Sequence, residues 1–235
     1  MLKYTQKLQP CLLQRRYKRF LADVTLDDNG EEVIAHCPNS GRMTGCVGEN
    51  WPAMVSQSDN PKRKLKYTLE MTHNGTTWIV TNTNKANELA CEGIEAGLVE
   101  ELFGYESYTR EVKYGKNSRI DILAESGDKK CYIEVKSVTM INELGQYCFP
   151  DSPTVRGQKH LCELVDMVKE GHRAVMFYMV LREDGAGFTP AADIDPKYAE
   201  LLKWAVANGV EVFVYQGIVT PTELSMGSRI GLVVI

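Results

Sequence analysis

The hydrophobic pattern of the chain changes its period near residue 80, and this change limits the possible folds more than any other feature. Up to residue 80, apolar and polar residues alternate in short segments that are separated by turn-forming pieces such as "DDNGE" and "PNSGRMTG". The alternating segments are "YKRFLADVTL", "EEVIAHCP", "LKYTLEMTH" and "TTWIVTNT". Because a period of two is typical of half-buried strands, residues 1–80 are predicted to form a small β-barrel or sandwich.

After Thr83 the apolar residues recur every three or four positions, which predicts a helix over "NKANELACEGIEAGLVEEL". Three strand candidates follow, joined by the short turns "GKN" and "SGDK": "YTREVKYG", "SRIDILAE" and "KCYIEVKSV". The pattern then reads helix, strand, helix, strand: "QKHLCELVDMVKEGH", "RAVMFYMVL", "DPKYAELLKWAVANG" and "VEVFVYQ". Helices that connect apolar strands predict a mixed sheet covered on both faces. Residues 81–235 are therefore expected to form an α/β/α domain, and the fold class is α/β.

Composition limits the cellular compartments in which the protein is expected. The longest apolar run, "AVMFYMVL", is far shorter than the roughly 20 residues that cross a bilayer, so no membrane partner is expected. The N-terminal stretch is interrupted by Pro10 and by charges, unlike a secretion signal. The seven scattered cysteines include no C-x-x-C pair, which suits a reducing cytoplasm and disfavours a zinc site in "HCPNSGRMTGC". A cytoplasmic protein is the expectation.

Charge is distributed unevenly along the chain. Residues 1–80 carry 11 Lys and Arg against 8 Asp and Glu, whereas residues 81–235 carry 16 against 23. A basic first part in an acidic protein suggests a polyanionic partner for that part.

The stretch "CYIEVKSVTM" places an acid and an amine on one predicted strand. Side chains two positions apart in a strand share a face, so Glu134 and Lys136 project side by side. Asp121 lies on the preceding strand, and a hairpin would bring its carboxylate next to that of Glu134. A second E-x-K pattern, Glu111 and Lys113, has no acid on a preceding strand. Asp121, Glu134 and Lys136 are therefore the candidate catalytic residues.

Two adjacent carboxylates are unfavourable unless a proton or a metal ion lies between them. Mg²⁺ or Mn²⁺ fits, because these ions take oxygen ligands, and Glu92 of the first helix is the preferred third ligand beside Asp121 and Glu134. Lys136 would position a water molecule and offset negative charge on a scissile phosphate. The alternative is an ion pair with a purely structural role.

Several basic residues are candidates for contacts with DNA. The run "QRRYKRF" interleaves charges with aromatic rings, as in barrels that bind single strands, and "PNSGRMTG" offers small residues that let backbone approach a phosphate. The loop "FPDSPTVRGQKH" precedes a helix N-terminus, which favours phosphate. The alternatives are solvated faces, a plain turn and, for His160, a packed or capping role. The candidates are Arg15, Arg16, Lys18, Arg19, Arg42, Lys62, Arg63, Lys64, Arg156, Lys159 and His160.

The order of helix, "SRIDIL" and "IEVKSVT" resembles the PD-(D/E)xK nuclease superfamily, with "ID" where that superfamily often has "PD". Together with "HCPNSGRMTGC", "TNTNKAN" and "FPDSPTVRGQKHLCEL", these motifs resemble the sugar fermentation stimulation protein family, SfsA. The resemblance implies an N-terminal OB-like barrel, a nuclease-like second domain, DNA binding with little sequence preference, and regulation of maltose metabolism.

Two functions stay open at this point. One is a DNA-binding protein with a divalent-metal phosphodiesterase site, and the other is a non-catalytic, DNA-binding regulator of sugar metabolism genes on the same scaffold. A helix-turn-helix reader is disfavoured because a strand, "VEVFVYQ", follows the last helix. Single-stranded and duplex DNA are both candidate partners. Nucleases of this superfamily often pair to cut both strands, so a homodimer is also open, although no self-complementary surface is marked.

Overall fold

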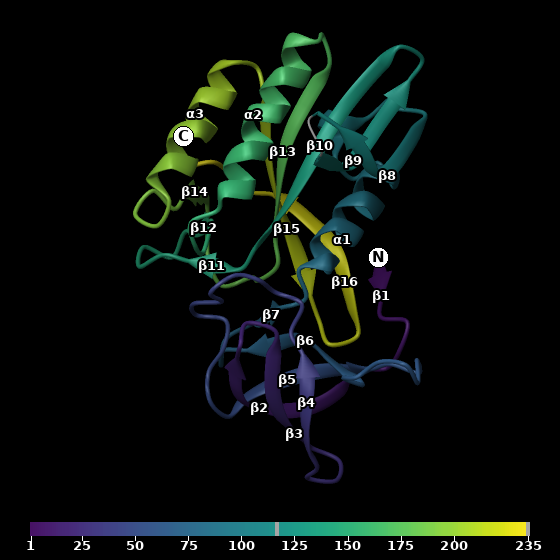
Figure 1. Ribbon diagram of the computed structural model, residues 1–235, viewed down its shortest axis with the longest axis vertical. Helices are drawn as coiled ribbons and strands as arrows, with labels where there is room; N and C mark the ends of the chain where they lie inside the picture. The colour runs from purple at the N-terminus through teal and green to yellow at the C-terminus, as the bar shows by residue number, and fades with distance from the viewer. Residues whose placement is uncertain (116–117, 234–235) are drawn as a thin grey trace.

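The computed structural model describes residues 1–115 and 118–233, which form two domains stacked end to end (Figure 1). The first domain is a sheet with the strand order β4-β3-β2-β5-β6-β7. An additional pairing of β4 with β6 closes strands β2 to β6 into a barrel. The strands are β2 (Gln9–Tyr17), β3 (Leu21–Leu26), β4 (Glu32–His36), β5 (Trp51–Gln57), β6 (Tyr67–His73) and β7 (Trp78–Val80).

The barrel confirms the predicted β architecture, but two of its strands lie outside the segments expected from alternation. Strand β2 carries the basic run and still buries Cys11 and Leu13. Strand β5 buries only the small side chains of Ala53 and Val55. Apolar residues stand next to each other in both strands, as in Leu12–Leu13 and Met54–Val55, so the alternation with period two is weak.

The second domain contains a seven-stranded mixed sheet with the order β1-β16-β15-β13-β10-β9-β8. Strands β10, β13 and β15 run parallel, and the outer pairs are antiparallel. The predicted meander of three strands is confirmed as β8, β9 and β10, although residues 116 and 117 of the expected turn "GKN" lie outside the described residues. The elements are β1 (Leu2–Lys3), α1 (Asn84–Glu95), η1 (Glu100–Leu102), β8 (Ser107–Tyr114), β9 (Ser118–Ser126), β10 (Lys129–Val138), β11 (Met140–Ile141), β12 (Tyr147–Phe149), α2 (Val155–Lys169), β13 (Arg173–Val180), β14 (Phe188–Pro190), α3 (Pro196–Ala207), β15 (Glu211–Val219) and β16 (Glu223–Arg229).

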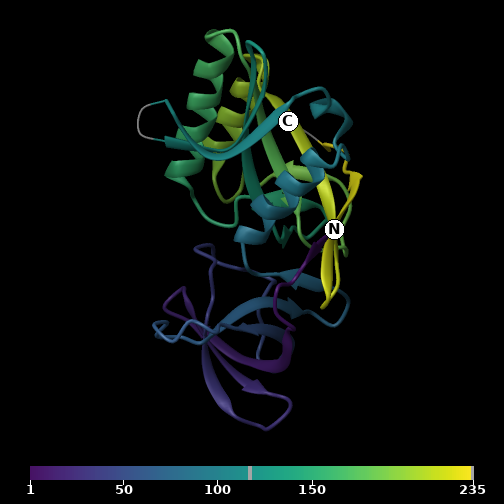
Figure 2. The same ribbon diagram turned by 90° about the vertical axis from the view of Figure 1, so that its right-hand side faces the viewer.

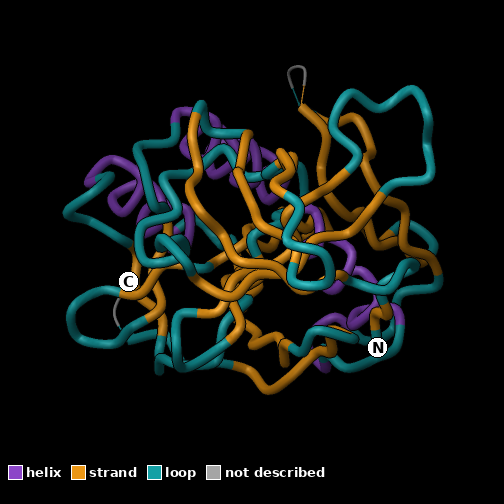
Figure 3. The backbone as a smooth tube through the Cα atoms, turned by 90° about the horizontal axis from the view of Figure 1, so that it is seen from below, coloured by secondary structure: helices purple, strands orange, loops and turns teal. Residues whose placement is uncertain are grey.

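Helices cover both faces of this sheet, as predicted. Leu89 and Ile94 of α1 share a buried cluster with Ile133 and Val135 of β10. Helices α2 and α3 pack on the other face with Val138. Seen from the barrel end, the helices lie on the two sides of the strands (Figure 3). No helix among the described residues has the length and apolarity needed to cross a bilayer.

Helix α1 is shorter than the sequence pattern predicts. It ends at Glu95, and Gly97 then adopts a positive φ of 71°. Glycine reaches this left-handed conformation at little cost, which is why helices commonly stop beside it. Val99 and Leu102, which continue the apolar spacing, are buried in and around the short helix η1 instead.

The first residues of the chain belong to the second domain. Leu2 and Lys3 of β1 pair with Leu224 and Glu223 of β16, at the junction of the two domains (Figure 2). Strand β1, which lies within the expected first domain of residues 1–80, is thus an edge strand of the second sheet. Strand β7 ends at Val80, and α1 begins at Asn84.

Candidate metal site and nucleic-acid interface

A pocket of about 300 Å³ lies where the two domains meet, and it contains the three predicted catalytic residues. Its floor comes from β9, β10 and the start of α1, and its walls from two loops. One wall is the barrel segment 39–41, and the other is the segment 148–154 before α2. Asp121, Glu134 and Lys136 are thus brought together, as the hairpin argument predicts.

Asp121 lies where β9 and β10 stop pairing. The last pair of the ladder is Ile122 with Ile133, so the backbone N–H of Val135 turns to the side chain of Asp121 and donates to Oδ2 over 2.8 Å. The amide Nδ2 of Asn87 donates to Oδ1 over 2.9 Å. Burial, reinforced by the negative charge of Glu134, raises the pKa of Asp121 to about 6.

Glu134 and Lys136 face the same side of β10, as predicted. The Lys136 Nζ donates to Glu134 Oε1 over 2.6 Å, and His160 Nδ1 contacts the same oxygen. Burial alone would raise the pKa of Glu134, but Lys136 and His160 outweigh it and lower the pKa below its usual value. Glu134 is only 2% exposed, and its Oε2 makes no hydrogen bond with any described residue.

His160 lies beneath the site. It is 3% exposed and sits between the Nζ of Lys136, 3.3 Å from Nδ1, and the Nε of Arg156, 3.4 Å from Nε2. The buried ring contacts Glu134 and Lys136, and its binding to DNA stays a prediction. The second turn of α2 puts it there because the apolar face of the helix packs on the sheet.

Glu92 lies outside the pocket, contrary to the expected metal site. Its Oε1 contacts the α-amino group of Met1, near the β1–β16 pair. The helix side chain that reaches Asp121 is Asn87, five positions earlier, which is about 140° away around the helix axis. In the described part of the chain, no three His, Cys, Asp or Glu side chains converge around a common metal position.

Asn87 is not among the site residues predicted from the sequence. The available signal was the pair Asn84 and Asn87, polar residues three apart at the start of a helix whose neighbouring face is apolar. Both line the pocket.

A second, basic pocket adjoins the first. It is lined by Arg16, Arg19 and Arg42 of the barrel, and it shares four residues with the carboxylate pocket: Ser40, Gly41, Ser152 and Thr154. The two hollows therefore form one trough that runs from barrel arginines to the carboxylates.

Family comparisons agree with this two-part arrangement. A model described as "SfsA N-terminal OB domain" matches residues 15–81, and one described as "Sugar fermentation stimulation protein RE domain" matches residues 84–223. The chain belongs to the SfsA family. Its curated relatives include sugar fermentation stimulation protein homologs of Geotalea uraniireducens, 51% identical over 96% of both chains, and of Geobacter sulfurreducens, 51% identical over 93% of both. The solved structure of Pyrococcus furiosus SfsA in complex with Ca²⁺ superposes with a TM-score of 0.88 at 27% identity, with full coverage of both chains.

Within this SfsA-family fold, the predicted DNA-binding residues fall into different places. Arg16 points into the fold of its own domain, where it donates to the carbonyl oxygens of Asn39 and Gly41 over 2.8 and 3.0 Å. Arg19 and Arg42 are exposed in the basic pocket, and Arg156 is exposed at the rim of the carboxylate pocket.

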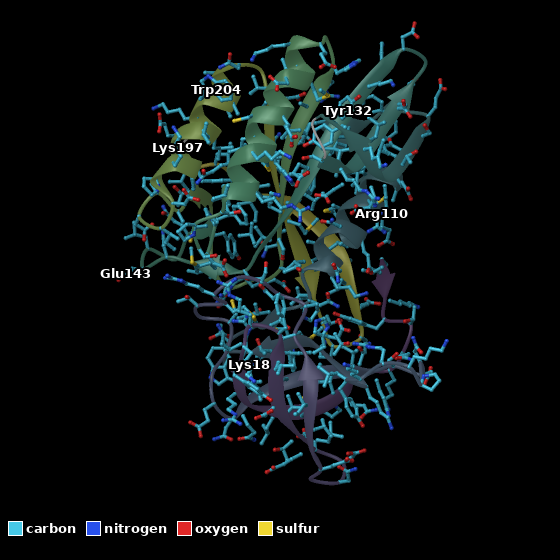
Figure 4. The ribbon with its side chains drawn as sticks, viewed as in Figure 1. Lys18, Arg110, Tyr132, Glu143, Lys197 and Trp204 are labelled. Carbon is cyan, nitrogen blue, oxygen red and sulfur yellow. The ribbon has the colours of Figure 1, made fainter. Side chains whose placement is uncertain are left out.

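The remaining candidates lie elsewhere on the surface. Arg15 pairs with Asp23 over 2.7 Å. Lys159 contacts Ser118 and Glu163. Lys18 lies in the turn after β2, on the barrel below the junction of the domains (Figure 4). Lys62, Arg63 and Lys64 belong to the β5–β6 loop, none of whose described residues lines either pocket. Their binding to DNA stays a prediction.

Proposed function

We propose that this SfsA-family protein binds DNA with little sequence preference and hydrolyses phosphodiester bonds with Mg²⁺ or Mn²⁺. The observation that carries the proposal is Oε2 of Glu134, which is buried beside Asp121 without a partner among the described residues. An unsatisfied buried carboxylate oxygen is costly, and a cation would offset that cost.

The donors in the pocket suit a hard divalent cation. Asp121 and Glu134 supply carboxylate oxygens. The carbonyl oxygen of Val135 is a further candidate ligand, because the C=O and N–H of a strand residue point to the same side and this N–H faces Asp121. Mg²⁺ keeps several water ligands, so few protein ligands suffice. The Pyrococcus furiosus relative was solved in complex with Ca²⁺, and this supports a hard-cation site in the family. When bound, such an ion lowers the pKa of a water molecule and polarises the phosphate.

The side chains around the pocket have distinct proposed tasks. Lys136 holds Glu134 in place and presents an ammonium group to the phosphate oxygens, where negative charge grows during hydrolysis. Asn87 orients Asp121 through its amide. His160 keeps Glu134 and Lys136 together from below.

The basic trough supports binding of DNA through its phosphates. Arg19, Arg42 and Arg156 are exposed along one path to the carboxylates. Phosphate contacts carry no sequence information, so affinity should fall steeply with salt and vary little with sequence.

A second candidate is a non-catalytic, DNA-binding regulator of sugar (maltose) metabolism genes. The observation that favours it is the ligand count. Among the described residues no three His, Cys, Asp or Glu side chains converge on a metal position, and one of the two carboxylates at the floor of the pocket, Glu134, already pairs with Lys136. In that case the acidic pocket would be a remnant of the fold.

Cleavage assays distinguish the two functions. Labelled single-stranded and duplex DNA are incubated with Mg²⁺, Mn²⁺ or EDTA, and wild type is compared with Glu134→Gln and Lys136→Met, while binding is followed in EDTA. Metal-dependent cuts that vanish in both variants while binding persists support the nuclease. Binding without cuts in either metal supports the regulator.

A further inference from the structure

We propose that the strand bound in the trough is single-stranded DNA, with phosphates on Arg19 and Arg42 and a base stacked on Phe20. The inference rests on the proposed function, since it names the DNA form that the same site takes.

The barrel wall of the pocket is anchored at both of its ends. At one end, Thr83 donates to the carbonyl oxygen of Pro38 from its hydroxyl over 2.9 Å. At the other, Cys46 Sγ donates to the carbonyl oxygen of Thr139 over 3.3 Å.

The middle of this wall is fixed to the opposite loop. The N–H of Met43 donates to Asp151 Oδ2 over 2.9 Å, and a methyl group added at Gly41 would collide with the Asp151 carboxylate at 2.2 Å. The two walls therefore touch each other, and the loop does not swing aside without breaking contacts to the second domain.

The carboxylate pocket beside this contact has room for one strand at most. The pocket holds about 300 Å³, the lower end of the range for small-molecule sites, and Glu134 at its floor is 2% exposed. Two paired strands present their phosphates on a stiff, wide cylinder that this space does not admit. An unpaired backbone can leave the helical path and enter.

Phe20 supplies the surface that an unpaired base needs. Its side chain is 45% exposed, and its ring lies 6.4 Å from that of His36. The N–H of Cys37 donates to the carbonyl oxygen of Phe20 over 2.8 Å, which places Phe20 at the foot of the barrel wall. Its neighbour Arg19 lines the trough. Exposed aromatic rings beside a basic groove bind bases of single strands by stacking, whereas duplex bases are already stacked on each other.

Binding in EDTA tests the inference without reference to cleavage. The probes are a fluorescein-labelled strand of about 20 nucleotides that does not self-pair and its blunt duplex, measured by anisotropy at one salt concentration. We expect the single strand to bind at least about tenfold more tightly, Phe20→Ala to weaken single-strand binding about tenfold, and Phe20→Trp to retain it. The matched control is Phe103→Ala, which removes another exposed aromatic ring, 74% exposed, from the second domain. Equal or tighter binding of the duplex, or equal effects of Phe20→Ala and Phe103→Ala, would overturn the inference.

A cleavage arm separates this inference from the proposed function. The substrate is a duplex with a single-stranded tail, incubated with Mn²⁺. Cuts confined to the single-stranded tail support both the nuclease and the single-strand inference. Cuts spread through the duplex overturn the single-strand inference and keep the nuclease. Tight, Phe20-dependent binding of the single strand without any cut overturns the nuclease and keeps the inference.

Discussion

The backbone N–H of Val135 donates to the carboxylate of Asp121 over 2.8 Å at the point where their two strands separate. This bond fixes Asp121 at the end of the β9–β10 ladder, next to the first residues of β10 that leave the pairing. The carboxylate is thereby held between a backbone donor, the Asn87 amide and the buried Glu134, and its charged form is disfavoured.

Replacement of Asp121 by Asn should stabilise the metal-free protein at neutral pH. The pKa of this carboxyl group is about 6 in the folded chain, above its ordinary 3.8, so the folded state binds more protons between these values. Its contribution to stability therefore falls as pH rises through that window. In EDTA we expect Asp121→Asn to raise the free energy of unfolding by about 1–3 kcal/mol near neutral pH, with no gain near pH ~4.

Urea titrations at the two pH values measure this effect, with the exposed Asp193→Asn as the matched control. Addition of Ca²⁺ should stabilise wild type and leave Asp121→Asn unchanged. A variant less stable than wild type at neutral pH in EDTA would show that the carboxylate stabilises the fold.

Glu134 and His160 should be energetically coupled. The two side chains contact each other in a buried setting, so removal of either deprives the other of one buried partner. A double-mutant cycle with Glu134→Gln and His160→Ala should give a coupling energy of about 1–3 kcal/mol in the free energy of unfolding. Additive effects of the two substitutions would contradict the role assigned to His160.

Asp195 should stabilise the fold at neutral pH and lose this effect in acid. It accepts hydrogen bonds from the N–H groups of Thr154 and Tyr198 and from the Gln158 side chain, so it links the N-terminal ends of α2 and α3. Burial alone would raise its pKa, but these donors lower the pKa below its usual value. The stabilisation is therefore present at neutral pH and lost as pH falls through the lowered pKa.

Asp195→Ala should cost about 1–3 kcal/mol at neutral pH, measured by thermal or urea unfolding. The exposed Asp193→Ala, two residues earlier, serves as control and should change the free energy of unfolding by less than about 0.5 kcal/mol. Equal effects of the two changes would argue against the proposed link between the helices.

Arg42→Ala should weaken DNA binding and reduce its salt dependence. Each phosphate neutralised by a cationic side chain releases counterions. Loss of one contact should therefore make the negative slope of log affinity against log salt shallower by roughly 1. Arg15→Ala is the comparison, because Arg15 already pairs with Asp23 on the surface. Salt titrations of both variants decide whether the basic pocket or the wider charge of the barrel binds the phosphates. A slope unchanged in Arg42→Ala would remove this residue from the interface.

Much of the site could be predicted because its geometry is local. Glu134 and Lys136 share a face through the period of two, and a hairpin with a short turn places Asp121 beside them. The barrel and the covered sheet follow from the change in hydrophobic period for the same reason.

Features that depend on distant contacts have no local signal in the sequence. The spacing within α1 does not define how the helix is rotated over the sheet, so the sequence favours Glu92 although Asn87 is the side chain that reaches Asp121. The burial of His160 depends on how closely α2 packs over β10, and the two-residue strand β1 pairs with β16 at the opposite end of the chain. No local pattern encodes such contacts.

The pairing of β1 with β16 makes the barrel an insertion within the sheet domain. The chain starts in that sheet, crosses to the barrel after β1 and returns after β7, so two separate crossings tether the barrel. A domain held by a single linker can rotate about it, but two anchored strands of backbone remove much of that freedom. The carboxylates of one domain and the arginines of the other are therefore held in a fixed arrangement. Weakening the small β1–β16 pair, which lies outside the trough, would change how the two ends of the trough face each other.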